Sequence, residues 1–527
     1  MTAPEQPAPP RYDVAIIGGA LAGAATALLL LREKPTLRIL ILEKSSAFTR
    51  RVGEATVEVS GYFLGRVLGL TQHLNDAHLV KQGMRFWFAN AQAQTLADCS
   101  EIGSRYQVRL PAWQVDRAVL DEEVLRRAVT AGAELWRPAS VNQVQLSAGG
   151  EQALSVRRVD RTETVSARWV VDASGVAALL ARQEGWLRPN EAHPTTGVWA
   201  RWSGVKDWDG LDLAQKYPAW AKACRGTRGT ATNHLVGDGW WAWFIPLKGG
   251  DVSIGVVFDE RLVKWPAGGS LGQRLKDFLV QHPVGRELLA EAQWKEGDVH
   301  WRRHLPYSSA VHAGDGFVLV GDAAAFLDPL YSPGMDWVAY TTTRAADLIC
   351  AQQDGGEVGP LIARHNRDFT RSYERWFEAL YRDKYEYLGE FDLMRLAFKL
   401  DLRLYYLGVV TQPFKRGPAA FRDPVFCTPP STPVFYFMRG YNRRLAAIAR
   451  ARRARGALGR TNAGCRHVFA GFTLELGSAL GLVKSVLGWG WLELTEGWRS
   501  WLPAGRTPDA TWEAAPARAG AAVESEA

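Results

Sequence analysis

The feature that most constrains this chain is a strand–glycine–helix–strand pattern near its N-terminus. An apolar run, Asp13-Val-Ala-Ile-Ile17, leads into Gly18-Gly-Ala-Leu-Ala-Gly23, an Ala/Leu-rich helix former and a second apolar run ending in Glu43. Such glycines let a backbone approach a pyrophosphate, and a helix N-terminus offers free N–H groups. Glu43 lies 20 residues after Gly23, where a carboxylate accepts hydrogen bonds from a ribose. The pattern predicts a dinucleotide-binding unit, although Ala20 replaces the middle glycine.

The same stretch has an alternative interpretation as a membrane span, because Val14 to Leu31 carries no charge over 18 residues. Interior glycines, a matched second strand and a following acid have no role in such a span. The preceding tail is Pro-rich and lacks a basic region of the kind that begins a signal peptide. The dinucleotide-binding unit is therefore favoured.

The composition is typical of a large cytoplasmic protein with more than one core. A chain of 527 residues with 47% hydrophobic content can form two or three lobes. Its five cysteines include no Cys-x-x-Cys pair, which fits reduced thiols in a cytoplasm and gives no zinc site. The net charge of +8 is mild for this length and much of it lies in Arg439 to Arg466, so no nucleic-acid partner is expected.

Further segments have the residue types of a cofactor site. The loop Thr49-Arg-Arg-Val-Gly-Glu-Ala-Thr56 can strap a phosphate and a ribityl chain, and a solvated loop is the alternative. Arg117, near the start of a helical segment, can reach a phosphate. Lys81 precedes a turn glycine and an apolar strand, and a lone lysine is by itself usually a surface residue.

Two later strands end in acids. One ends in Asp172-Ala-Ser-Gly175, as expected where a parallel sheet returns to a cofactor. The other ends in Gly321-Asp322 and is followed by a loop and a helix that starts near Gly334. Such an aspartate can hold a sugar-alcohol hydroxyl, and a glycine-led helix N-terminus can face a flavin's carbonyl edge.

The sequence pattern changes between Gly197 and Arg302. Short runs of alternating apolar and polar residues there predict antiparallel strands with one face exposed to solvent. Trp241 and Trp243 are two residues apart and therefore face the same side of a strand. Two indoles on one face form a flat apolar wall suited to an aromatic or polyene ligand, and core filling is the alternative.

In this order, the motifs resemble those of the FAD-dependent monooxygenases built like hydroxybenzoate hydroxylase, and within them the flavin-dependent halogenases. The resemblance rests on Gly53-Glu-Ala-Thr56, on Trp241-Ala-Trp-Phe-Ile-Pro246, and on Lys81, which aligns with the family's catalytic lysine. It covers about residues 12 to 345, and the C-terminal region fits the family only loosely.

The resemblance implies an enzyme of secondary metabolism, such as antibiotic biosynthesis, that installs chloride or bromide on an electron-rich aromatic using reduced FAD and oxygen. A separate flavin reductase is expected, because the chain has no second glycine-rich unit for a nicotinamide cofactor. Lys81 is then the catalytic residue and directs hypohalous acid as a hydrogen-bond donor or as a haloamine. The other expected residues are, for FAD, Gly18, Ala20, Leu21, Ala22, Gly23, Glu43, Lys44, Arg51, Gly53, Glu54, Ala55, Arg117, Asp322, Gly334 and Met335; for the substrate, Trp241, Trp243, Phe244 and Tyr331; and for the halide, Ser332 and Gly334, with no metal.

Two departures from the family pattern bear on the reaction. The family binds its halide on backbone N–H groups of a Ser-(Ser/Thr)-Gly loop, and proline in Ser332-Pro333-Gly334 removes one of these donors. Tryptophan halogenases carry a glutamate where this chain has Tyr331, whereas phenol-type members carry an aromatic residue. Tyr331 therefore favours a phenolic or pyrrolic substrate, either free or tethered to a carrier protein.

Three alternative functions remain open. A hydroxylase would use the same cofactor constellation without a halide. The aromatic stretch from Phe469 to Trp501 suggests a flavoprotein reductase or desaturase acting on a polyene or lipid. A non-catalytic docking protein would use Arg439 to Arg466 against an acidic carrier domain or a membrane surface, so the C-terminal region is also a candidate for peripheral membrane contact.

The expected architecture is α/β. A Rossmann-like FAD-binding domain is formed by residues 12–195 and 306–350, and an antiparallel-sheet substrate domain is inserted at 196–305. A helical C-terminal region follows at 351–502, and residues 1–11 and 503–527 are expected to be disordered tails.

Overall fold

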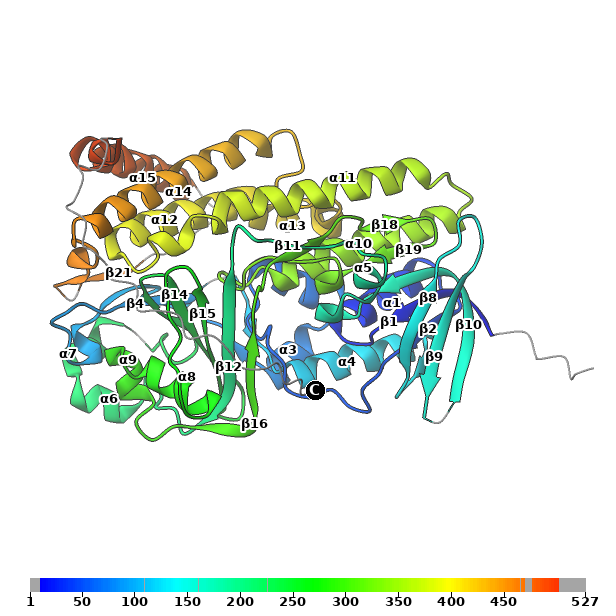
Figure 1. The fold of residues 1–527 in the computed structure, drawn as a ribbon, viewed down its shortest axis with the longest axis horizontal. Coiled ribbons are helices and arrows are strands. Elements are labelled where there is room, and N and C mark those ends of the chain that lie inside the picture. The colour runs from blue at the N-terminus through cyan, green and yellow to red at the C-terminus, as the bar shows by residue number, and fades with distance from the viewer. Residues whose placement is uncertain are drawn as a thin grey trace, which may run out of the picture.

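The structure is a computed structural model that describes residues 10–501 except 109, 160, 225, 465 and 470–475. Figure 1 shows two separate sheets, with the helices of the C-terminal region running along one side of both. The expected tail at 503–527 lies outside the described residues, as do all but the last two residues of the tail at 1–11. The predicted helical C-terminal region is confirmed.

The first sheet has a parallel centre. In spatial order its path is β18 (Ala313–Gly314), β19 (Phe317–Leu319), β10 (Arg161–Asp172), β1 (Arg11–Ile17), β2 (Ile39–Leu42) and β7 (Glu134–Trp136). The strands from β19 to β7 are all parallel, whereas β18, β9 (Gln152–Arg158) and β8 (Ser140–Gln145) attach antiparallel. Alternate residues of β1 and β2 enter two different hydrophobic clusters, because both faces of the sheet are covered.

The predicted N-terminal unit is present. The uncharged stretch is divided between β1 and α1 (Leu21–Glu33), with the glycine turn between them. α1 packs against α4 (Arg117–Thr130) and α10 (Gly334–Gln353), so all three helices cover one face of the first sheet. Within the part of the chain that the structure describes, each helix is too short or too polar to cross a bilayer.

The second sheet is mixed rather than wholly antiparallel. Its order is β16 (Gln293–Arg302), β12 (Thr195–Ser203), β15 (Val252–Asp259), β14 (Trp240–Pro246), β13 (Thr232–Gly237), β4 (Met84–Phe88), β5 (Ser100–Gly103) and β21 (His467–Phe469). The five strands from β16 to β13 are antiparallel, as expected, but β4 joins β13 in parallel and β21 joins β5 in parallel. The sheet therefore includes strands from outside the expected segment 196–305. β4 occupies an interior position in it because this strand has large buried side chains on both faces.

The two faces of the second sheet are covered differently. One face packs under four short helices, α6 (Leu211–Lys216), α7 (Pro218–Ala223), α8 (Leu271–Leu279) and α9 (Pro283–Leu288). The other meets the C-terminal helices, as in the edge-to-face pair of Phe86 and Phe398, whose ring centroids are 5.2 Å apart. The same large hydrophobic cluster thus continues from the first sheet through this interface into the C-terminal region.

The remaining helices and strands connect these layers. The C-terminal helices are α11 (Gly359–Trp376), α12 (Phe391–Tyr405), α13 (Thr411–Arg416), α14 (Ser431–Ala454) and α15 (Leu476–Thr495). The shorter elements are α2 (Glu58–Tyr62), α3 (Thr71–Ala77), α5 (Leu179–Gln183), β3 (Leu79–Val80), β6 (Trp113–Gln114), β11 (Leu187–Pro189), β17 (Tyr307–Ser309) and β20 (Ala325–Phe326).

Most arginines of α14 form ion pairs with acidic side chains of this protein. Arg452 is paired with Glu390, Asp392 and Glu496, and Arg444 is paired with Glu493. Arg439, Arg450, Arg453 and Arg455 also have acidic partners. Much of the charge between residues 439 and 466 therefore joins helices to one another instead of forming a free basic surface.

Candidate active site

The glycine turn after β1 is closely packed against the neighbouring strands. Gly18 has a φ of +98°, and a Cβ there would lie 2.5 Å from the carbonyl oxygen of Ala173 at the end of β10. A Cβ at Gly23 would overlap the carbonyl oxygen of Gly18. Ala20 precedes α1 with an ordinary φ of −70°, so its methyl group causes no backbone strain. Glycine is thus required at 18 and 23 and is dispensable at position 20.

Glu43 fixes the same turn from the end of β2. Its carboxylate accepts hydrogen bonds from the N–H groups of Gly19 at 2.9 Å and Ser45 at 2.8 Å. A carboxylate can accept about four hydrogen bonds, so capacity remains for ribose hydroxyls. Leu21 and Ala22 lie in the first turn of α1, and Lys44 is exposed directly after Glu43.

The loop from Thr49 to Thr56, here called the strap loop, is bonded to α4 and to the second sheet. The Arg117 guanidinium donates to Asp121 at 3.1 and 3.2 Å and to the carbonyl oxygen of Val52 at 3.3 Å. Gly53 has a φ of +92°, and a Cβ there would come within 2.8 Å of Arg117 Nη1. Arg51 Nη1 lies 3.7 Å from Asp121. Ala55 is buried and pairs with Gln114 in an isolated bridge.

Glu54 is a buried acid with a buried partner. Its Oε1 accepts from Arg201 Nη2 at 2.6 Å, and Arg201 also donates to Asp116 at 3.1 Å. Burial raises the pKa of Glu54 to about 7, although the charge of Arg201 opposes the shift. This pair joins the strap loop to β12.

The expected cofactor residues gather at one edge of the first sheet. Asp322 follows β19, Asp172 ends β10 and Glu43 follows β2, so the acids lie at the carboxyl ends of parallel strands, where such sheets bind dinucleotides. Burial raises the pKa of Asp322, and the charges of Arg117 and Arg302 oppose that shift. The close-packed glycine turn, the acids and Arg117 fit a dinucleotide such as FAD.

Lys81 is a buried residue, not a surface lysine. Its side chain is nearly inaccessible to water, and Nζ donates to the carbonyl oxygen of Thr56 at 2.9 Å. Burial lowers the pKa of Lys81 to about 8, while the charges of Glu58 and Asp336 act in the opposite direction. Lys81 therefore has a hydrogen-bond acceptor in the strap loop and interacts electrostatically with two carboxyl groups.

The loop before α10 is conformationally strained. Tyr331 and Ser332 have φ values of +68° and +58°, which non-glycine residues rarely adopt and which concentrate at functional sites. The Ser332 N–H donates to the carbonyl oxygen of Pro329 at 3.0 Å, and Pro333 has no N–H to offer. Gly334 and Met335 follow at the start of α10, where no side chain caps the helix. The backbone donors that this region can offer an anion thus lie at the helix start.

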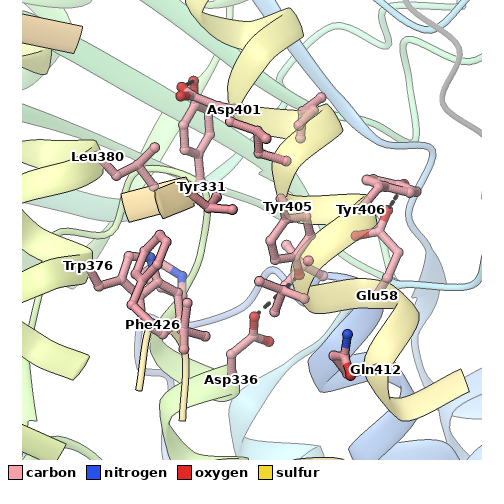
Figure 2. A pocket seen from close by; sticks show the side chains of 18 of the residues that line it. Glu58, Tyr331, Asp336, Trp376, Leu380, Asp401, Tyr405, Tyr406, Gln412 and Phe426 are labelled. Carbon is pink, nitrogen blue, oxygen red and sulfur yellow. Dashed lines mark hydrogen bonds between the residues drawn. The ribbon is translucent and has the colours of Figure 1, made fainter. Parts of the chain in front are cut away.

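A cavity of about 460 Å³ lies beside this loop and is largely apolar. Its wall includes Met84 of β4, Pro333, and Trp376, Leu380 and Tyr381 around the end of α11. The acids in its lining are Glu58, Asp336, Asp401 and Asp423. Figure 2 shows Glu58 and Asp336 near Tyr405 and Tyr406, and Tyr331 close to Asp401.

Each of the two acids near Lys81 is held by a tyrosine. Asp336 accepts from the Ser60 N–H at 2.9 Å and from the Tyr405 hydroxyl at 3.3 Å, and Glu58 accepts from the Tyr406 hydroxyl. Burial raises the pKa of Asp336 to about 7. These side chains form a polar patch in an otherwise apolar cavity.

Asp401 and Lys384 were missed by sequence reasoning, and both are buried close to Tyr331. Lys384 Nζ donates to Asp401 at 2.7 Å and to Asn442 at 3.0 Å, and the Tyr331 hydroxyl donates to Asp401 at 3.2 Å. Glu58 and Asp336 were missed as well. The available signal was positional, because Glu58 lies two residues after Thr56 and Asp336 two residues after Gly334.

Trp241 and Trp243 do not form the wall of the cavity that was expected from the sequence. Trp241 and Trp243 share a face of β14, with ring centroids 5.8 Å apart, but neither is among the residues that line the cavity. The Trp241 indole N–H donates to the Tyr385 hydroxyl at 2.7 Å, and Tyr385 donates to Asp328 at 2.9 Å. Trp241 thus supports the loop that carries Tyr331. Phe244 points to the opposite face of the strand, into the cluster under the short helices.

Comparisons with known protein sequences identify the family of this chain. The sequence profile of the tryptophan halogenase family matches residues 13–97 and 88–383, which is more than half of the chain. The flavin-dependent halogenase chlA of Dictyostelium discoideum is 25% identical over 366 residues, covering 62% of this chain but only 58% of its own length. The sulochrin halogenase gedL of Aspergillus terreus is 26% identical over 393 residues, covering 70% of this chain and 68% of its own length.

A solved structure shows the same fold over nearly the whole chain. The halogenase PltM, crystallised with phloroglucinol and FAD, superposes with a TM-score of 0.71 at 19% identity, covering 91% of this chain and 96% of PltM. The resemblance seen in the motifs is confirmed by these matches. The chain therefore belongs to the tryptophan halogenase family of flavin-dependent halogenases.

Proposed function

We propose that this protein halogenates the ring of a free phenolic or pyrrolic substrate, with phenols favoured. The observation that carries the proposal is the buried lysine, Lys81, which interacts electrostatically with Glu58 and Asp336, two acids in the lining of a cavity of about 460 Å³. An amine in this environment can lose its proton near neutral pH, so it can serve as a hydrogen-bond donor or as a nucleophile toward hypohalous acid.

FAD would be held at the carboxyl edge of the first sheet by the glycine turn, Glu43, Arg117 and Asp322. Reduced FAD, supplied by a separate reductase, would activate oxygen, which is the oxidant for the halide. The residues of this chain do the remaining work: they orient the cofactor, exclude water and direct the oxidant.

The acids of the cavity favour a substrate with free hydroxyl groups. A phenol can donate hydrogen bonds to Asp336 and Glu58, while the apolar lining covers the ring. Phloroglucinol, a small phenol, is bound in the PltM structure, and one related chlorinase is named for a pyrrole held on a carrier protein. A phenol with two or more hydroxyl groups suits this cavity better than a pyrrole, because it can donate to more than one of the acids, whereas a pyrrole offers one ring N–H.

Hydroxylation of the same phenol is the second candidate, and Pro333 is the observation that favours it. Halide binding would depend on the backbone at Gly334 and Met335, since the Ser332 N–H is already bonded to Pro329 and Pro333 has none. If the halide binds weakly, the ring would be hydroxylated instead of halogenated.

The test measures product mass after incubation with FAD, a flavin reductase, NADH, oxygen, bromide or chloride, and phloroglucinol or resorcinol. We expect a halogenated phenol from the wild type. Lys81→Met should lose halogenated product at least about a hundredfold, because it keeps the side-chain length but removes the amine. FAD binding, followed by flavin fluorescence, should stay unchanged.

Two outcomes would contradict the proposal. A product that gains oxygen and no halogen at any bromide concentration would assign the chain to the hydroxylases. If Lys81→Met still halogenated the substrate, halogenation would not require Lys81. Lys222→Met is the matched control, because Lys222 is exposed on α7, outside the cofactor and substrate sites.

A further inference from the structure

One face of the C-terminal helix is apolar and exposed. Between residues 480 and 501, large apolar side chains recur every three or four residues and are 48–76% exposed. They are Leu480, Val483, Leu487, Trp491, Leu494, Trp498 and Trp501, here called the α15 stripe. With 1.5 Å of rise per residue, the stripe is about 30 Å long. Figure 1 places α15 at the outer edge of the molecule.

The opposite face of α15 packs against α12. Ser485 and the glycines at 481 and 488 let the helix approach α12, where Arg403 donates to Ser485 at 2.9 Å. Glu493 and Glu496 point inward to Arg444 and Arg452. The acids of this helix are therefore consumed by internal ion pairs, and the α15 stripe is not needed to hold the helix in place.

Two exposed cations lie beside the α15 stripe, and two half-buried ones, Arg395 and Lys399, lie on α12, which packs along α15. Arg403 of α12 is used in that packing. Burial, with the neighbouring charges of Arg395 and Arg403, lowers the pKa of Lys399, so these cations are close enough to repel one another. Lys484 is exposed on α15 itself, and Arg499 is exposed beside Trp498.

We propose that the α15 stripe docks the protein on an anionic membrane surface. The stripe has the spacing of an amphipathic helix that lies in the plane of the lipid headgroups, and its tryptophans are suited to that interface. The flanking cations would contact acidic lipid headgroups. A second copy of the chain is a poorer occupant, because the same cations would face each other across the contact.

The test measures sedimentation of the full-length protein with vesicles of phosphatidylcholine, with or without phosphatidylglycerol. We expect binding to the anionic vesicles and a decrease at high salt. Leu487→Gln/Trp491→Gln/Leu494→Gln should reduce the bound fraction about tenfold or more while keeping helix-forming residues in place. Leu211→Gln is the matched control, since Leu211 is exposed on α6, far along the chain from the stripe.

Light scattering during size-exclusion chromatography measures the oligomeric state and so tests whether a second copy of the chain occupies the α15 stripe. The proposal would be overturned if the wild type did not bind vesicles and was a dimer while the triple variant was a monomer. The α15 stripe would then be a self-association surface. Equal vesicle binding by the wild type and the triple variant would also overturn it. Halogenation of a soluble phenol should be the same in both proteins, so the outcome is independent of the proposed reaction.

Discussion

Lys81 and Asp336 are ionisable side chains that lie almost completely out of contact with water. Burial shifts both toward their neutral forms, lowering the pKa of Lys81 to about 8 and raising that of Asp336 to about 7. Both therefore titrate near neutral pH, which is where a group that exchanges protons with a substrate is most effective. Desolvation, a property of the surroundings, shifts both pKa values toward neutral pH.

At the residue scale, we expect Asp336→Asn to change stability in a pH-dependent way. Because the folded-state pKa of Asp336 is raised, its contribution to stability is present below pH 4 and is lost as the pH rises through 7. Asparagine has no charge to bury and can still accept from the Ser60 N–H. The variant should gain about 1–3 kcal/mol over the wild type at pH 8 and much less at pH 5.

Urea unfolding at the two pH values measures this difference. Asp212→Asn, an exposed acid on α6, should show no comparable pH dependence. An Asp336→Asn effect of equal size at pH 5 and pH 8 would mean that the carboxyl group is charged throughout this range in the folded protein.

At the scale of the element, the loop from Asp328 to Pro333 is held by partners from distant segments. Asp328 accepts from the Leu330 N–H at 2.9 Å and from Tyr385, and His193 Nε2 lies 2.9 Å from its carboxylate. Through Tyr385 the network reaches Trp241 in β14. These bonds can maintain the left-handed backbone of Tyr331 and Ser332 because they fix the loop on both sides of the strain.

We expect Pro333→Ser to strengthen halide binding. Pro333 has an ordinary helical backbone, φ −76° and ψ −12°, which serine adopts without strain. The substitution adds an N–H at the start of α10, worth about 0.5–1.5 kcal/mol if it reaches the anion. The bromide KM should therefore fall about two- to tenfold in steady-state halogenation.

The control for this loop is Pro189→Ser on β11, an exposed proline that should leave the bromide KM unchanged. An unchanged KM in Pro333→Ser would show that the halide does not approach this part of the backbone. A switch from hydroxylated to halogenated product would identify Pro333 as the residue that limits halide use.

At the scale of the whole molecule, a buried arginine unites the C-terminal helices. Arg452 of α14 lies 3.0 Å from Glu390, 2.8 Å from Asp392 at the start of α12, and 2.7 Å from Glu496 after α15. Its side chain is almost wholly buried. The position of α12 matters for function, because this helix contributes Asp401 and Tyr405 to the cavity.

We expect Arg452→Gln to destabilise the protein strongly. Removing one partner of a buried ion-pair network leaves uncompensated charge, which costs about 3–5 kcal/mol. Thermal denaturation should show a clear fall in Tm. Arg455→Gln is the control, because Arg455 is more exposed and lies 3.4 Å from the same Glu496, so its loss should cost less than about 1 kcal/mol. Equal losses in the two variants would contradict this assignment.

The sequence by itself determined the N-terminal dinucleotide unit, the antiparallel core strands, the helical C-terminal region and the family. Each depends on local periodicity or on short motifs, such as Gly18 to Gly23, which the chain must satisfy before any distant contact forms. Turn glycines and the alternating pattern of a strand can be recognised within one short segment of the sequence.

Only the tertiary structure decided what surrounds those residues. It buried Lys81 beside Asp336, gave Trp241 a partner in Tyr385, and used the arginines of α14 inside the protein. It also placed β4 in the second sheet. The physical reason is that the residues that desolvate a side chain and form its hydrogen bonds come from separate segments of the chain, such as Tyr385 for Trp241, and no local pattern predicts which segments will come together.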